Sequence, residues 1–234
     1  MTRRIGAIGD IHADAAALAA VLEWLGHHGL SEVVCAGDIA GFGPYPNQCI
    51  SMLAGHGIRA VMGNSDFDLL HPRVRHEPVS RRSREIDAIE DWVRGQLSEQ
   101  SRSFLRALPD SLSLEGGVLV VHGSPGDLSG VVSQTDAPPP IAEGIKVVVA
   151  GHLHVPFISR HRSGIWVNAG SAGRPCDGDP RPAVCVLTES DGAWAALQHR
   201  IPYDPQESVR DVRLSGMPFA ENLASAILEA RWYR

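Results

Sequence analysis

The segment Arg4-Ile5-Gly6-Ala7-Ile8-Gly9-Asp10-Ile11-His12 (residues 4–12) sets the architecture that we expect for this chain. Residues 4–8 form a short apolar run of the kind found in buried β-strands, and Gly9-Asp10 marks a turn at its end. Asp10 and His12 are two residues apart. Because alternate residues of an extended segment point the same way, both side chains can face one site.

The same arrangement recurs four more times. Each short apolar run is followed by a glycine and a polar side chain: residues 32–36 before Gly37-Asp38, 59–62 before Gly63-Asn64, 118–121 before His122-Gly123, and 146–150 before Gly151-His152-Leu153-His154. A helix is predicted over residues 14–24, with Asp14 as its N-cap. Strands that alternate with helices indicate parallel βαβ units, in which ligands gather at the carboxyl ends of the strands.

The rest of the chain predicts further helices and hairpins. Helical patterns cover residues 83–97, 98–108, 205–215 and 219–231, and the first pair is expected to break near Gly95. Four closely spaced strand-like runs, at 156–159, 165–168, 183–187 and 194–199, favour antiparallel hairpins. No repeat or linker divides the sequence, so one domain over residues 1–234 is expected.

Composition narrows the class of protein. Apolar residues make up 44% of the 234 residues and charged residues 21%, as in an ordinary globular protein. The net charge of −6 provides no basic surface for nonspecific nucleic-acid or membrane binding. The chain has neither a signal-peptide core nor an apolar run of the roughly 20 residues that cross a bilayer. Its four cysteines lack CxxC spacing and are expected to be free thiols, which favours the cytoplasm.

The polar residues at the strand ends form a set suited to metal ions. Three carboxylate or amide oxygens and four imidazoles suit Mn, Fe, Co, Ni or Zn better than Ca or Mg alone. A single Asp or His after a glycine is usually a turn residue, but five such endings in one chain indicate a common site. Seven donors are too many for one ion and fit two ions that share a carboxylate. The candidate ligands are Asp10, His12, Asp38, Asn64, His122, His152 and His154.

These motifs resemble those of a known family. The series GDIH (9–12), AGDIAGFG (36–43), GNSD (63–66), VHGSP (121–125) and GHLH (151–154) resembles the calcineurin-like metallophosphoesterase superfamily, in particular its small prokaryotic phosphodiesterase branch. NAGSAGRPCDGDPRPAV (168–184) and RIPYDPQ (200–206) also match that branch. The resemblance implies an α/β fold of four layers, with two mixed β-sheets flanked by helices.

The resemblance also implies roles. Asp10, His12 and His154 would hold one divalent transition-metal ion, and Asn64, His122 and His152 a second, with Asp38 bridging them. Mn is the first choice, and Fe, Ni and Zn are alternatives. A bridging hydroxide would attack phosphorus in line. Together with Asp38 and Asn64, Ser65 and Asp66 are the expected catalytic residues.

One position departs from the family pattern. Many members carry a proton-donating His where this chain has Ser65, and serine cannot act as an acid at neutral pH. The absence of this His should slow the cleavage of alkyl esters more than the cleavage of phosphoanhydrides, aryl esters or 2′,3′-cyclic phosphates. His71 or His76 is a candidate substitute, although both also fit a solvated surface. Arg174 is a candidate phosphate ligand, with a solvated loop charge as the alternative.

The sequence leaves three functions open. Hydrolysis of small phosphodiesters leads, and a dinucleoside-polyphosphate hydrolase of the diadenosine tetraphosphate type is the alternative because its leaving group departs easily. A non-catalytic scaffold of the same fold ranks last, because all seven ligands are present. The expected partner is a small phosphate ester or nucleotide, with no membrane and no strong sign of nucleic-acid binding; a homo-oligomer is left open.

Overall fold

The computed structural model describes residues 2–72, 80–134, 141–162 and 164–233, and these build two five-stranded sheets. The first sheet has the order β10 (Ala193–Arg200), β9 (Ala183–Ser190), β1 (Arg3–Ile8), β2 (Val33–Cys35) and β3 (Arg59–Ala60). The second has the order β4 (Ser111–Leu114), β5 (Val118–Val121), β6 (Val147–Ala150), β8 (Gly164–Asn168) and β7 (Phe157–His161).

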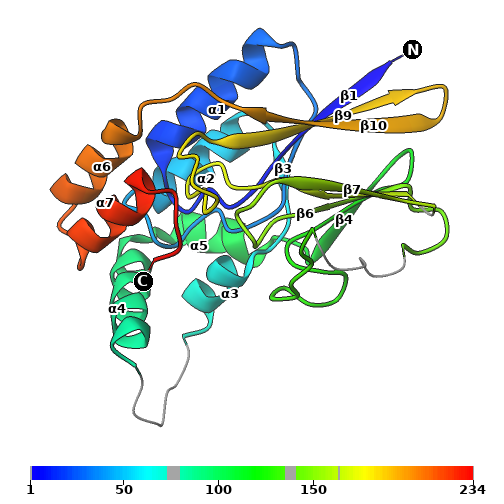
Figure 1. The fold of residues 1–234 in the computed structure, drawn as a ribbon. Helices are drawn as coiled ribbons and strands as arrows, with labels where there is room; N and C mark the ends of the chain where they lie inside the picture. The colour runs from blue at the N-terminus through cyan, green and yellow to red at the C-terminus, as the bar shows by residue number, and fades with distance from the viewer. Residues whose placement is uncertain (1, 73–79, 135–140, 163, 234) are drawn as a thin grey trace.

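Both sheets are mixed, which confirms the prediction. In the first sheet β1, β2 and β3 are parallel, and β9 and β10 are antiparallel additions. In the second, β5, β6 and β8 are parallel, with β4 and β7 as antiparallel edges. Figure 1 shows the two sheets one above the other, with the helices gathered on one side. The polar motifs follow the carboxyl ends of the parallel strands of both sheets.

Side-chain alternation places one face of each sheet against the other. Ile5 and Ala7 of β1 belong to the apolar layer between the sheets, whereas Ile8 belongs to the cluster beneath the helices. On the opposite sheet, Val147 and Val149 of β6 face this inner layer and Val148 faces outward. Burial on both faces accounts for the continuous apolar runs in these strands.

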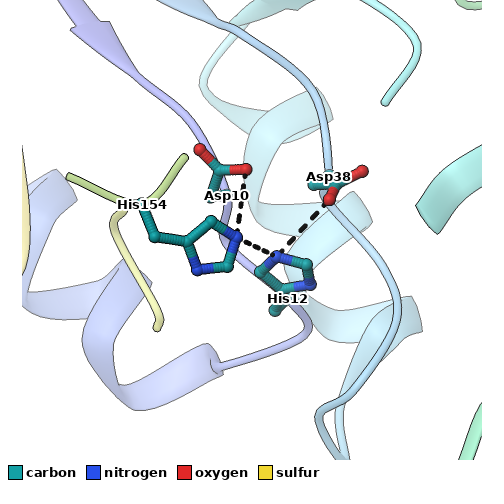
Figure 2. A group of neighbouring side chains, drawn as sticks. All are labelled: Asp10, His12, Asp38 and His154. Carbon is teal, nitrogen blue, oxygen red and sulfur yellow. Dashed lines mark hydrogen bonds and ion pairs between the residues drawn. The ribbon is translucent and has the colours of Figure 1, made fainter. Parts of the chain in front are cut away.

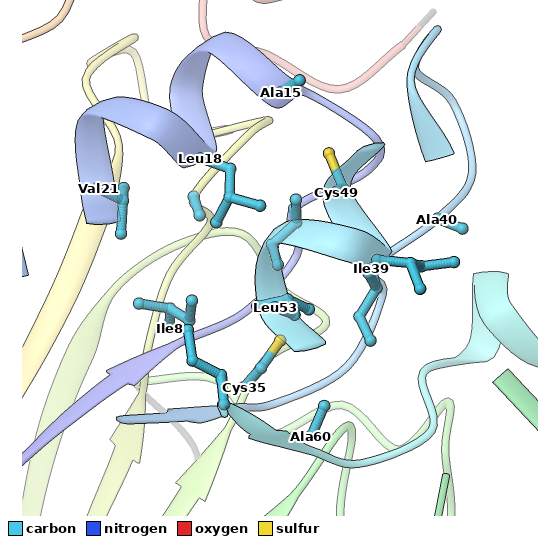
Figure 3. Close-up of a cluster of buried hydrophobic side chains, with 14 of the residues drawn as sticks. Ile8, Ala15, Leu18, Val21, Cys35, Ile39, Ala40, Cys49, Leu53 and Ala60 are labelled. Carbon is cyan, nitrogen blue, oxygen red and sulfur yellow. The ribbon is translucent and has the colours of Figure 1, made fainter. Parts of the chain in front are cut away.

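Seven helices lie within the described residues, and each contributes buried side chains to the cluster outside the first sheet. In Figure 3, Leu18 and Val21 of one helix and Leu53 of the next lie over Ile8 and Cys35 of the strands. The helices are α1 (Ala15–His27), α2 (Pro46–Gly55), α3 (Asn64–Leu70), α4 (Arg81–Gln96), α5 (Glu99–Arg106), α6 (Pro205–Leu214) and α7 (Ala220–Leu228).

The outer face of the second sheet carries a smaller apolar cluster. Its described covering consists of loop side chains, among them Val132, Ile141 and Ile145, which pack near the buried Trp166. Within the described part of the chain, no helix is long and apolar enough to cross a membrane.

Several element boundaries differ from the sequence-based expectation. The Asp14 cap is confirmed, since its carboxylate accepts a hydrogen bond from Ala17 N at 3.0 Å. The helical pair breaks at Leu97 rather than near Gly95, because Ser98 caps α5. Helix α3 and strand β4 were not predicted. The last helix ends at Leu228, three residues short of the expected boundary.

The loops that follow β2 and β3 touch backbone to backbone. A Cβ on Gly63 would overlap the backbone nitrogen and Oδ1 of Asp38. A Cβ on Gly37, whose φ is +88°, would lie 2.8 Å from Gly63 N. The glycines of the recurrent motif are therefore needed because the polar loops approach so closely.

We predict that Gly63→Ala separates these loops, lowers the free energy of unfolding and weakens metal binding. Gly95→Ala is the matched control, because Gly95 is exposed in α4 and a Cβ there meets nothing within 4 Å. The control should stabilise the protein by about 0.5–1 kcal/mol. Thermal unfolding and metal analysis check both variants. Equal stability and metal content in the two variants would contradict the close approach.

Candidate metal centre

Four side chains from three strand ends form a compact buried group. Asp10 and His12 follow β1, Asp38 follows β2 and His154 follows β6, and each is at most 3% exposed. One donor atom from each lies within 4.8 Å of all the others, which makes the group able to hold a metal ion. Figure 2 shows the two imidazoles facing each other, with a carboxylate on either side.

Short contacts link the donor atoms of this first group. His12 Nε2 and His154 Nε2 are 3.0 Å apart. His12 Nε2 lies 3.5 Å from Asp38 Oδ2, and His154 Nε2 lies 3.4 Å from Asp10 Oδ1. Four donors thus converge on one point.

A second group lies on the other side of Asp38. Asn64 Oδ1 is 2.9 Å from His122 Nε2 and 2.8 Å from His152 Nδ1. His122 Nε2 lies 3.4 Å from Asp38 Oδ1, the oxygen that faces away from the first group. Asn64 and His152 are partly exposed, so this group is more accessible than the first. The structure thus brings all seven predicted residues together, with Asp38 between the two groups.

The hydrogen bonds of the histidines test whether cations fit here. The Nδ1 of His122 lies 2.7 Å from Ala36 O, and the Nδ1 of His154 lies 2.6 Å from Arg174 O. A carbonyl oxygen only accepts, so each Nδ1 carries the proton and each Nε2 presents a lone pair. These lone pairs face carboxylate or amide oxygens and another imidazole. Donor atoms that face one another without protons between them fit metal ions.

Burial shifts the pKa values in the direction that metal binding requires. It holds the pKa of His12 and His154 well below the usual range, so both rings are neutral at pH 7. Burial also raises the pKa of Asp38 to about 6, and burial together with the Asp38 charge raises that of Asp10. A divalent cation offsets this penalty, because it stabilises the ionised carboxylates.

The backbone turns sharply at the ligand positions. Asp10, His12, Asp38, His152 and His154 all have φ between 49° and 70°. Left-handed backbone is uncommon outside glycine, although Asp and His adopt it more readily than most residues. Such conformations persist when surrounding contacts hold them.

Two residues after Asn64 hold the loops in place. Ser65 donates to Asp38 through its backbone nitrogen, 2.8 Å from Oδ1, and through its hydroxyl, 2.9 Å from Oδ2. Asp66 is fully buried and accepts hydrogen bonds from the backbone nitrogens of Ile39, Ala40 and Gly63 at 2.9–3.2 Å. Asp66 thus ties the loop after β2 to the loop after β3.

A cavity of about 170 Å³ opens beside the two groups. Arg174 lines it and is only 7% exposed, with its guanidinium 4.6 Å from the centre of the Phe42 ring. Within the described residues this guanidinium forms no ion pair, and burial lowers its pKa. Arg181, by contrast, pairs with Asp179 at the surface.

A model described as the calcineurin-like phosphoesterase superfamily domain matches residues 4–192. The chain belongs to this superfamily. The chain is similar to the crystal structure of a metallophosphoesterase from Sphaerobacter thermophilus. The match has a TM-score of 0.78 and 25% sequence identity, and it covers 97% of this chain and 100% of that one.

Two archaeal proteins are also similar over nearly their full lengths. The structure of the hypothetical protein PH1004 from Pyrococcus horikoshii has a TM-score of 0.80 at 19% identity, over 99% of both chains. The uncharacterized protein MJ0912 of Methanocaldococcus jannaschii is 24% identical over 235 residues, 92% of this chain and 93% of that protein. The family membership and the α/β fold expected from the sequence are confirmed.

Other residues that line the cavity were not anticipated from the sequence. Arg82 and Ile86 of α4, and Trp232 and Tyr233 near the C-terminus, line the same space. The signal that could have found Trp232 and Tyr233 is the pair of aromatic residues just beyond the last helix, because such large side chains usually pack on a neighbouring surface.

Of the proposed substitutes for a proton donor, His71 is exposed, and its ring packs at a tilt against that of Phe67 with the ring centroids 4.4 Å apart. His76 lies outside the described residues. Among the described residues, the only imidazoles lining the cavity belong to the candidate ligands His12, His152 and His154.

We predict that Asp66→Asn weakens the tie between the ligand loops. The amide keeps one accepting oxygen but turns an NH₂ group toward a backbone N–H, so the free energy of unfolding should fall by about 1–3 kcal/mol. Metal affinity should fall as well, because the loop after β2 carries Asp38. Asp110→Asn removes a carboxylate at an exposed position and is the control. Denaturant titration and metal analysis distinguish the two; unchanged values for Asp66→Asn would exclude the bracing role.

Proposed function

We propose that the chain hydrolyses small phosphodiesters with the help of two divalent metal ions, Mn²⁺ being the first choice. The observation that supports this most directly is the position of Asp38. Its Oδ2 faces the first donor group and its Oδ1 faces the second, at 3.5 Å and 3.4 Å from an imidazole nitrogen. One carboxylate shared by two mixed oxygen and nitrogen groups is the arrangement that a metal pair requires.

The proposed roles follow from these positions. Asp10, His12 and His154 would hold one ion, Asn64, His122 and His152 would hold the other, and Asp38 would be shared between them. When bound, such a pair activates a water molecule and neutralises charge on the phosphoryl oxygens. Ser65 orients the bridging carboxylate through its two hydrogen bonds, and Asp66 fixes the loop behind it.

The buried position of Arg174 favours an anionic substrate. Burying an unpaired guanidinium is costly, and the contact with Phe42 returns only part of that cost. A phosphate group in the cavity would provide the missing partner, because its oxygens match the planar donors of Arg. We therefore propose that Arg174 binds a phosphoryl oxygen of the substrate.

Ser65 favours substrates with good leaving groups. Its hydroxyl donates to Asp38 Oδ2 at 2.9 Å and is therefore not directed at a leaving oxygen. The same observation keeps a dinucleoside-polyphosphate hydrolase as the second candidate, because a nucleotide leaves without a proton donor. The proposal places the enzyme in the cytoplasm, where its four free cysteines would stay reduced.

We predict a substrate order in Mn²⁺ that follows the leaving group. Bis-p-nitrophenyl phosphate and 2′,3′-cyclic AMP should be hydrolysed, and dialkyl phosphates should react about 10²–10⁴ times more slowly. A kcat/KM for diadenosine tetraphosphate above that for every diester would favour the second candidate.

Asp38→Asn should lower both activity and Mn²⁺ affinity by more than about 100-fold. Full activity in that variant would refute the shared-ligand role, and absence of both metal and activity in the parent protein would favour a scaffold.

We predict opposite effects of Arg174→Met on binding and stability. Inhibition by inorganic phosphate should weaken by about 10–100-fold, because one or two charge-assisted hydrogen bonds are lost. The melting temperature of the ligand-free enzyme should stay the same or rise, because an unpaired buried charge is removed. Arg181→Met, at an exposed ion pair, should change neither quantity. A fall in stability with unchanged phosphate inhibition would assign Arg174 a purely structural role.

A further inference from the structure

The chain after α7 does not extend into solvent but packs beside the metal centre. Figure 1 shows this last segment passing from α7 toward α4. Ala230 O accepts a hydrogen bond from Gly178 N at 3.0 Å. Tyr233 is 2% exposed, and its hydroxyl donates to Glu85 Oε2 of α4 at 2.8 Å. Residues 229–233, the C-terminal segment, are therefore held against the body of the protein, and Trp232 and Tyr233 of this segment line the cavity.

Trp232 is the residue that this segment presents to the cavity. Its ring lies 4.7 Å from the ring of the candidate ligand His154, at an interplanar angle of 38°. The side chain lines the cavity, yet the residue remains 43% exposed. Its neighbour Tyr233 is buried, so Trp232 is not needed to fasten the segment.

Two other aromatic residues, Phe42 and Tyr233, line this cavity; Tyr233 is buried, and Phe42 is already in contact with other groups. Phe42 has the Arg174 guanidinium over its ring and the His12 ring at 5.7 Å in an edge contact. Tyr45, from the same loop as Phe42, does not line this cavity. Among the described cavity residues, Trp232 is thus the exposed aromatic surface beside the metal ligands.

We propose that Trp232 selects substrates by stacking on a planar aromatic group, a nucleobase or an aryl ring, attached to the phosphate. This inference rests on the proposed function only in placing the phosphate between Arg174 and the metal ligands. A group esterified to that phosphate would lie against the cavity wall that Trp232 forms. Stacking on an aromatic side chain is sequence-tolerant, because every base presents a π face.

The experiment compares two phosphate compounds that differ only by a base. Calorimetry with the Mn²⁺-loaded protein gives Kd for AMP and for ribose 5-phosphate, without any need for turnover. In the parent protein AMP should bind about tenfold more tightly or better. Trp232→Ala should bring the ratio of the two Kd values close to one, and Trp232→Phe should keep most of the preference.

The ratio separates stacking from a structural role. If the indole only supported His154, its removal would weaken both compounds equally and leave the ratio unchanged, which would overturn the proposal. Equal affinities in the parent protein, or no binding of either compound, would also overturn it. If Trp232→Ala does not fold, Trp232→Leu supplies an apolar side chain without a planar ring. A preserved base preference in a protein that hydrolyses no ester would refute the proposed function and support the stacking role.

Discussion

The carboxylate of Asp38 is the contact on which the arrangement of the site depends. It lies between two groups of donors, and the hydrogen bonds of Ser65 to both of its oxygens determine which oxygen faces which group. The loop that carries Ser65 can reach Asp38 only because Gly63 has no side chain. Asp66 then joins the two loops from behind. Each of these residues therefore acts on the centre through Asp38.

The electrostatics of these buried side chains favours the binding of metal ions. Asp10 and Asp38 are almost fully buried, and burial raises their pKa values, so the metal-free protein is penalised for ionising them. The neighbouring His12 and His154 are held neutral by the same burial. A cation removes the penalty for the carboxylates and leaves the imidazoles as they are. Metal binding should thus contribute to folding stability as well as to chemistry.

The sequence predicted the features that follow from local pattern. Five apolar runs, each followed by a polar residue at a turn, indicated which side chains would meet, because parallel strands end at the same edge of a sheet and alternate residues of a strand point the same way. It could not indicate that Ser65 bonds to Asp38, since that contact joins residues 27 positions apart. Helix α3 was missed because a seven-residue helix that begins at a ligand carries little periodic signal. The last helix was extended three residues too far, and nothing in the local pattern connected Trp232, just beyond it, with the site.

The candidate metal ligands and the cavity residues beside them come from different parts of the fold. The candidate ligands follow parallel strands, and their positions are set by the topology of the two sheets. Arg174 follows β8 in a loop, and Trp232 comes from the C-terminal segment, so both can vary without disturbing the strand ends. Because the Ser65 hydroxyl donates to Asp38, the proposed hydrolysis would depend on the leaving group of the substrate for the step that a proton donor would assist. Substrate selectivity would then come from the cavity wall, where an unpaired guanidinium and an exposed indole are the chemically distinctive groups.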